Sequence, residues 1–148
     1  MERNLRFSED EMVSALIALR ENEKPVYGFF AAFFALIPAV SMYFLFADMG
    51  GALYVMFAIP PAMVGFAARF VGRSYKFKHR LPVGFLGVFA HLVGCYLLNL
   101  NPFLYLMAPV AFVISASVAK VKLERVHIWA LDQEEMGKIN TNKQLNRD

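Results

Sequence analysis

Residues 26–47 read VYGFFAAFFALIPAVSMYFLFA, a run without a single charged residue. A helix needs about 20 apolar residues to cross a hydrocarbon core of about 30 Å, so this run is long enough to span a bilayer. Three further apolar stretches follow at residues 51–71, 81–98 and 103–119. Because a chain of 148 residues is too short to surround four such helices with polar elements, the pattern predicts four transmembrane helices.

The charged residues lie beside and between these stretches. All fifteen Lys and Arg residues fall into three blocks, Arg3–Lys24, Arg69–Arg80 and Lys120–Arg147, and Asp48 is the one charge that interrupts the apolar regions between the blocks. The charged fraction of 18% is below the soluble norm of about 25%. The basic residues flank apolar stretches instead of forming a stripe, so we expect the lipid bilayer as a partner and no nucleic acid.

The links between the stretches indicate the topology. Residues 48–50 and 99–102 are short enough only for tight helical hairpins, and Gly72–Arg80 holds basic residues without an acid. The positive-inside rule places this middle link and both termini in the cytoplasm. The expected fold is an all-α integral membrane protein of a bacterial inner (plasma) membrane. Residues 25–119 form its four-transmembrane-helix bundle of two helical hairpins.

The two predicted hairpins are weakly alike. The first begins KPVYGFF at residues 24–30 and the second RLPVGFL at residues 80–86, while LYVM at 53–56 and LYLM at 104–107 open their returning helices. One interpretation is a parallel pseudo-repeat about an axis along the membrane normal. The alternative is chance, since Leu, Phe, Gly and Pro are common in membrane helices.

Residues 1–24 predict a cytoplasmic amphipathic helix. Ser8 and Glu11 have the spacing of a capping box at a helix N-terminus. Apolar side chains then recur at helical spacing at Met12, Val13, Leu16 and Ile17. We expect this helix to end before Pro25 and either to lie on the membrane surface or to dock on the basic middle link.

Residues 120–148 predict a cytoplasmic tail that is helical and then frayed. Val121, Val126 and Trp129 continue a helical pattern, so the fourth span either extends into the cytoplasm or bends into an interfacial helix anchored by Trp129. The tyrosines fall mostly near predicted membrane interfaces, as in aromatic belts. They are Tyr27, Tyr43, Tyr54, Tyr96 and Tyr105.

His91 and Cys95 are candidate binding residues inside the third stretch. They lie one helical turn apart on one face, and buried polar groups are costly in lipid. Zinc normally needs four ligands, and a haem with two histidine ligands needs a second intramembrane histidine, so we expect neither a metal nor a cofactor. The structural alternative is a neutral His91 that is hydrogen-bonded to a backbone carbonyl or to Ser41.

Pro60 and Pro61 lie at the centre of the second stretch and remove two N–H donors, so we expect a helix kink there. Pro38 and Pro109 predict further kinks in the first and fourth spans. Pro60 and Pro61 share the predicted depth of His91, which makes them candidates for a midplane binding site. The alternative is that the prolines serve only packing geometry.

The middle link is the second candidate site. Arg73, Lys76, Lys78 and Arg80 alternate with aromatic residues, a pattern that suits anionic lipid head groups or a protein partner. The same residues also serve as a topology signal.

No phosphate-binding loop, zinc-protease motif or nucleophile elbow is present, so we do not expect an enzyme. The first hypothesis is a non-catalytic assembly or accessory subunit of a membrane complex that packs against another membrane subunit or against itself. The alternative is an oligomeric small transporter or channel with a midplane site at His91 and the Pro60-Pro61 kink. A redox or haem-binding subunit is a third hypothesis.

Overall fold

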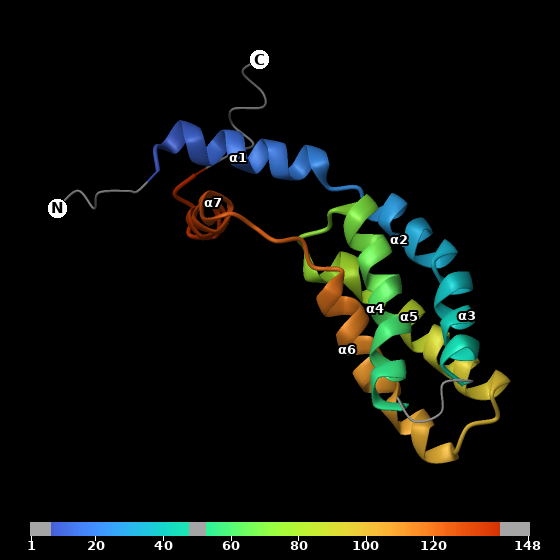
Figure 1. The fold of residues 1–148 in the computed structure, drawn as a ribbon. Coiled ribbons are helices and arrows are strands. Elements are labelled where there is room, and N and C mark those ends of the chain that lie inside the picture. Colours follow the sequence, from blue (N-terminus) through green and yellow to red (C-terminus); the bar gives the residue numbers. More distant parts are fainter. Residues whose placement is uncertain (1–6, 48–52, 140–148) are drawn as a thin grey trace. The chain divides into compact units, whose positions relative to one another are not determined.

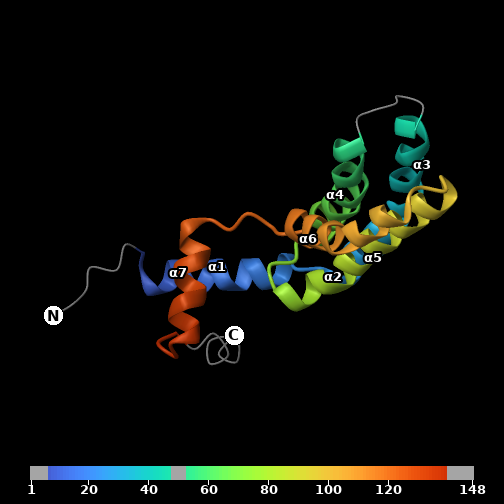
Figure 2. The same ribbon diagram turned by 90° about the horizontal axis from the view of Figure 1, so that it is seen from below.

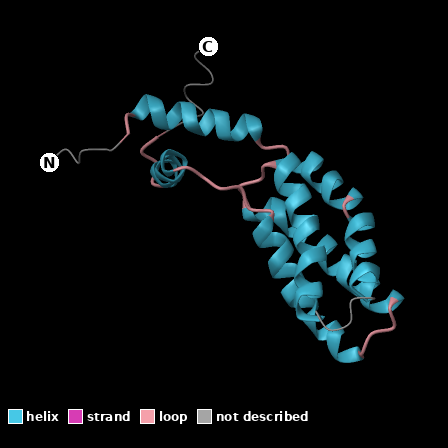
Figure 3. Cartoon of the chain, in the orientation of Figure 1, coloured by secondary structure: helices cyan, strands magenta, loops and turns pink. Residues whose placement is uncertain are grey.

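The computed structural model describes residues 7–47 and 53–139, and within these ranges the chain is helical, without a strand (Figure 1, Figure 3). The chain divides into two compact units. One is Lys24–Val121, and the other comprises the described parts of Met1–Glu23 and Lys122–Asp148. The expected all-helical architecture is confirmed for the described residues.

Helices α4 and α5 form the centre of the unit Lys24–Val121, since they contact each other and each also contacts α2, α3 and α6 (Figure 1, Figure 2). The elements of this unit are α2 (Pro25–Phe34), α3 (Leu36–Ala47), α4 (Leu53–Gly72), α5 (Phe77–Leu97), the 3-10 helix η1 (Pro102–Met107) and α6 (Ala108–Val118).

Two helical segments, Pro25–Phe46 and Phe77–Leu97, are long and apolar enough to cross a membrane. Ala58–Gly72 and Pro102–Val118 are shorter apolar segments. Of the four spans expected from the sequence, the structure therefore supports two as candidate membrane-spanning helices.

The first apolar stretch forms two helices, α2 and α3, with a break at Ala35. Pro38 has no N–H to donate to the carbonyl of Phe34, so the helical ladder is interrupted in the turn before it. The kink expected from Pro38 is thus present as a helix break. In contrast, α4 is helical without interruption through Pro60 and Pro61, both of which are buried.

The third and fourth spans depart from their expected boundaries. Helix α5 starts at Phe77 instead of Leu81, so the non-helical middle link is only residues 73–76. The expected fourth α-helix is instead η1 followed by α6, and Pro109 lies in the first turn of α6. A first-turn proline costs no helical hydrogen bond, so Pro109 marks a helix start and the kink expected within the span is wrong.

Local hydrogen bonds determine where α5 ends. Asn99 has a φ of 49° and lies just beyond the last helical turn. The Asn99 N–H donates to the Tyr96 carbonyl and the Leu100 N–H to the Cys95 carbonyl, as in a Schellman motif. The side chain of Asn101 then accepts from the Phe103 N–H and begins η1. This link turns the chain back within a few residues.

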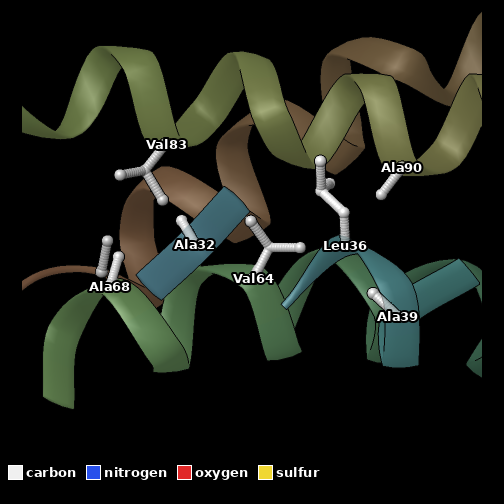
Figure 4. Close-up of a cluster of buried hydrophobic side chains, with 8 residues drawn as sticks. Ala32, Leu36, Ala39, Val64, Ala68, Val83 and Ala90 are labelled. Carbon is white, nitrogen blue, oxygen red and sulfur yellow. The ribbon is translucent and has the colours of Figure 1, made fainter. Parts of the chain in front are cut away.

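The interior of this unit is built from small side chains. Figure 4 shows alanines of several helices facing one another around Val64, Leu36 and Val83. A Cβ atom on Gly72 would come within 2.6 Å of the Gly28 Cα, so α2 and α4 cross in backbone contact. The Lys24 N–H also donates to the Gly72 carbonyl at 2.8 Å. Small residues thus permit the close approach of these two helices.

The second unit consists of α1 (Glu9–Asn22) and α7 (Arg125–Glu135), which cross at a steep angle in Figure 2. The capping box is confirmed: the Glu11 N–H donates to Ser8 Oγ at 3.2 Å and the Ser8 N–H to Glu11 Oε2 at 2.9 Å. The apolar face of α1 packs on α7, and Arg20 pairs with Glu134 at 2.6 Å. The buried apolar side chains are Met12, Val13, Leu16, Ala130 and Ile139.

Two expectations for the ends of the chain need correction. Helix α6 does not run on into the tail, because residues 120–124 are non-helical before α7 begins, and the alternative of an interfacial helix anchored by Trp129 stays a prediction. The apolar face of α1 is covered by α7, a partner that neither expected position of this helix included. The frayed segment expected from Gly137 lies almost entirely outside the described residues, and the pseudo-repeat stays a prediction.

Candidate functional site

His91 on α5 is fully buried and lies within hydrogen-bonding distance of two other elements. Its Nδ1 is 2.9 Å from the hydroxyl of Tyr43 on α3, and its Nε2 is 3.0 Å from the carbonyl oxygen of Leu104 in η1. One imidazole thus connects α5 with α3 and with η1.

The partners of His91 determine its tautomer. The Leu104 carbonyl can only accept, so Nε2 must carry the proton and donate it. Burial away from water favours the neutral imidazole. In that form Nδ1 is an acceptor, and the Tyr43 hydroxyl donates to it.

Cys95 is also buried, with its Sγ 3.6 Å from His91 Nε2. Gly94 makes room for the tyrosine, since a Cβ atom there would approach the Tyr43 ring carbons to within 2.7 Å. Replacing Gly94 by a larger residue would therefore displace the ring that donates to His91.

Of the two hydrogen-bond partners expected for His91, a backbone carbonyl and Ser41, the structure has the carbonyl, which belongs to Leu104. Ser41 instead donates to the Ile37 carbonyl on its own helix at 2.9 Å. Tyr43, which was expected in an aromatic belt, is only 1% exposed. The local sequence does not indicate the hydrogen bond between Tyr43 and His91, because the two residues lie 48 positions apart.

Ser115 on α6 forms a second buried polar contact. Its hydroxyl donates to the Val83 carbonyl on α5 at 3.0 Å. Gly65 and Gly87 lie against it, since a Cβ atom on either would meet Ser115. The small residues of the fourth apolar stretch are the sequence signal for this contact, although spacing alone does not identify its partners.

The polar groups in the described residues do not assemble a metal site: no three or more His, Cys, Asp or Glu side chains come together there. Pro60 and Pro61 are buried in α4, whereas the identified partners of His91 come from α3, α5 and η1. The hydrogen bonds of His91 therefore join α5 to α3 and η1.

The basic residues of the second candidate site differ in exposure. Arg73, Lys76 and Lys78 are exposed, whereas Arg80 is only 9% exposed and its Nε lacks a hydrogen-bond partner. The Arg80 guanidinium carbon lies 5.5 Å from the centre of the Phe77 ring. Arg73 has a φ of 46° and follows the end of α4. Three of the four basic residues are thus accessible to an anionic partner.

Comparison of the chain with protein-family models, with curated proteins and with solved structures finds no match.

Proposed function

We propose that Lys24–Val121 is an integral membrane bundle of four spans and that the protein is a non-catalytic assembly or accessory subunit of a membrane complex. The observation that carries the membrane proposal is the distribution of side-chain size, with small residues inside and large apolar residues outside.

The outer surface of the bundle is rich in exposed apolar side chains. Ile37, Phe70 and Tyr96 are 73%, 76% and 75% exposed. Of the most apolar 18-residue part of Pro25–Phe46, only 17% is buried, unlike a core helix of a soluble domain. Burying a large apolar side chain contributes about 1.5–3 kcal/mol, so a bilayer would stabilise this surface strongly.

Segment lengths support four spans. At about 1.5 Å per residue, the 22 residues of Pro25–Phe46, the 20 of α4 and the 21 of α5 extend about 30–33 Å. The 3-10 helix rises about 2.0 Å per residue, so η1 and α6 with 6 and 11 residues together reach about 28 Å. Each length is close to the hydrocarbon thickness of about 30 Å.

The buried polar groups favour packing over catalysis or transport. His91 uses both ring nitrogens on Tyr43 and Leu104, and Ser115 donates to Val83. A solute that used His91 would have to displace one of these partners. The transporter hypothesis thus needs an opening of the bundle, whereas the subunit hypothesis uses the contacts as they stand.

Cysteine labelling tests the proposed topology. In a Cys95→Ala background, which removes the one native cysteine, Lys76→Cys and Asn101→Cys each place a thiol in a link. An impermeant maleimide should label Asn101→Cys from outside intact cells and Lys76→Cys only in inverted vesicles. Labelling of both from one side, or extraction of the protein from membranes by alkaline carbonate, would contradict the proposal.

Purification in mild detergent tests the subunit role. We expect a homo-oligomer or a stoichiometric complex with another membrane protein, measured by native mass spectrometry. A monomer that carries solute flux in proteoliposomes, lost in His91→Ala and retained in Tyr96→Phe, would favour the transporter instead.

A further inference from the structure

Two adjoining grooves run along the outer face of α4 and share Phe66. The first, of about 490 Å³, is open and apolar. The second, of about 470 Å³, lies toward the C-terminal end of α4 and is lined by two arginines, Arg69 and Arg73, with Phe70 and Val121. The apolar groove is lined by Ala35, Ile59, Ala62, Met63, Phe66 and Val118.

The two ends of this surface differ in chemistry along one helix. From Ile59 to Arg69 the axis of α4 rises about 15 Å. This is half of a hydrocarbon core of about 30 Å, the depth of one leaflet. The surface therefore changes from apolar to cationic over the distance that separates the middle of a bilayer from its interface.

The cationic end lacks a counter-charge among the described residues. Neither Arg69 nor Arg73 makes an ion pair there, and Asp48, the one acid between Lys24 and Val121, lies outside the described residues. Phe66 and Phe70 stack beside the arginines, with ring centres 6.3 Å apart, and are 60% and 76% exposed. An anion would match the charge, and an amphipathic one would also cover the rings.

We propose that this surface binds one anionic phospholipid, with an acyl chain in the apolar groove and the phosphate at Arg69 and Arg73. Guanidinium groups suit phosphate because their N–H donors match its oxygens in pairs. The helix dipole already favours basic residues at the end of α4, yet it does not account for the apolar groove that leads to them.

This site rests on the membrane insertion proposed above and not on the subunit role. A transmembrane helix of a partner would also fit the small residues Ala35 and Ala62, but it would leave the two arginines without an anion. The charge therefore selects the lipid as the occupant.

Native mass spectrometry of the full-length protein in mild detergent tests the site, because the micelle has no anionic surface of its own. The protein is titrated with palmitoyl-oleoyl phosphatidylglycerol and, separately, with the phosphatidylcholine of the same chains. We expect a one-to-one complex with phosphatidylglycerol that forms at lower lipid concentration than the phosphatidylcholine complex. Equal binding of the two lipids would overturn the proposal.

Two double variants distinguish a specific lipid site from a diffuse electrostatic attraction between basic residues and anionic lipid. A basic residue near an anionic group contributes about fivefold to affinity, so Arg69→Gln with Arg73→Gln should weaken phosphatidylglycerol binding about 30-fold. Arg125→Gln with Lys138→Gln removes the same charge from exposed positions outside both grooves and should leave the one-to-one complex nearly unchanged. Equal losses in the two double variants would overturn the site.

A third arm tests the acyl chain. Ala62→Trp fills the apolar groove, whereas Ile37→Trp adds the same ring at an exposed position outside it. Each buried methylene contributes about fourfold, so displacing two of them from the groove costs about 15-fold. Unchanged phosphatidylglycerol binding in Ala62→Trp would overturn the position of the acyl chain in the groove. Loss of a stoichiometric partner protein from this variant, with lipid binding intact, would overturn it as well.

Inorganic phosphate distinguishes a lipid site from a simple anion site. Millimolar phosphate should not displace phosphatidylglycerol, because it cannot occupy the apolar groove, and complete displacement would overturn the proposal. Circular dichroism of each variant checks that the helices are retained. Failure of membrane insertion would appear in the cysteine labelling, whereas failure of the lipid site would appear only in these titrations.

Discussion

The contact between Tyr43 and His91 allows the role of the buried cluster to be measured. Replacing Tyr43 by Phe removes only the hydroxyl that lies 2.9 Å from Nδ1. The two side chains are 1% and 0% exposed, so water cannot replace the lost donor without opening the bundle. Tyr43→Phe should therefore destabilise the protein without changing its helix content.

The expected loss of stability in Tyr43→Phe follows from the burial of the Tyr43–His91 hydrogen bond and from the solvent around the protein. Leaving a buried acceptor without a donor costs about 1–3 kcal/mol in soluble proteins. Within membranes the coupling between such groups averages about 0.6 kcal/mol and reaches about 1.7, because the unfolded chain also finds partners there. We expect a loss of about 1 kcal/mol for Tyr43→Phe and a Tyr43–His91 coupling of about 0.6–1.7 kcal/mol.

The assay is a double-mutant cycle on the free energy of unfolding. Tyr43→Phe, His91→Leu and the double variant are unfolded by dodecyl sulfate in mixed micelles and followed by circular dichroism. Tyr96→Phe is the matched control, because its side chain is 75% exposed and its loss should change stability by less than about 0.5 kcal/mol. A coupling indistinguishable from zero, or equal losses in Tyr43→Phe and Tyr96→Phe, would refute the role of the hydrogen bond.

Four further substitutions test other parts of the structure. Gly72→Ala places a Cβ atom 2.6 Å from the Gly28 Cα and should destabilise the bundle by about 1–3 kcal/mol in the same unfolding assay; full stability would contradict the close helix crossing. Ser8→Ala removes the cap of α1 and should cost about 1 kcal/mol, measured as faster hydrogen exchange in the first turn; unchanged exchange would speak against the cap. Leu16→Ala opens the contact between α1 and α7 and should cost about 2–5 kcal/mol by hydrogen exchange of α1, whereas Arg20→Ala removes a partly exposed ion pair and should cost at most about 1 kcal/mol. Equal effects of the last two would contradict an apolar origin of this contact.

Several features were predictable because they depend on neighbours in the chain. Ser8 and Glu11 form their capping box within one turn, and Pro38 interrupts a helix within one turn. The boundary of α5 differs from the prediction because basic residues suit a link, whereas Lys78 and Arg80 lie in the first turn of the helix. The last apolar stretch begins with a 3-10 helix and not with the expected α-helix. The positions of prolines alone do not distinguish these two helix types.

The candidate site was predictable only in part. His91 stands out in the sequence because a histidine inside an apolar stretch must find a partner. The sequence predicts a backbone carbonyl as one possible partner of His91, and Leu104 supplies it. The predicted side-chain partner was Ser41, whereas the structure has Tyr43. The groove at Arg69 has no signal in the local sequence, since it also requires Val121, which lies 52 positions further along the chain.

The helical character, the segregation of charge from apolar stretches and the local caps follow from the sequence, because each depends on residues within a few positions of one another. Three contacts emerge only from the folded chain: α7 covers α1, Tyr43 donates to His91, and Ser115 lies against Gly65 and Gly87. These contacts join residues that are distant along the chain. Which surfaces pair depends on the shape of both. Small residues such as Gly28 and Gly72 indicate that a helix approaches closely, but they do not indicate which helix it is.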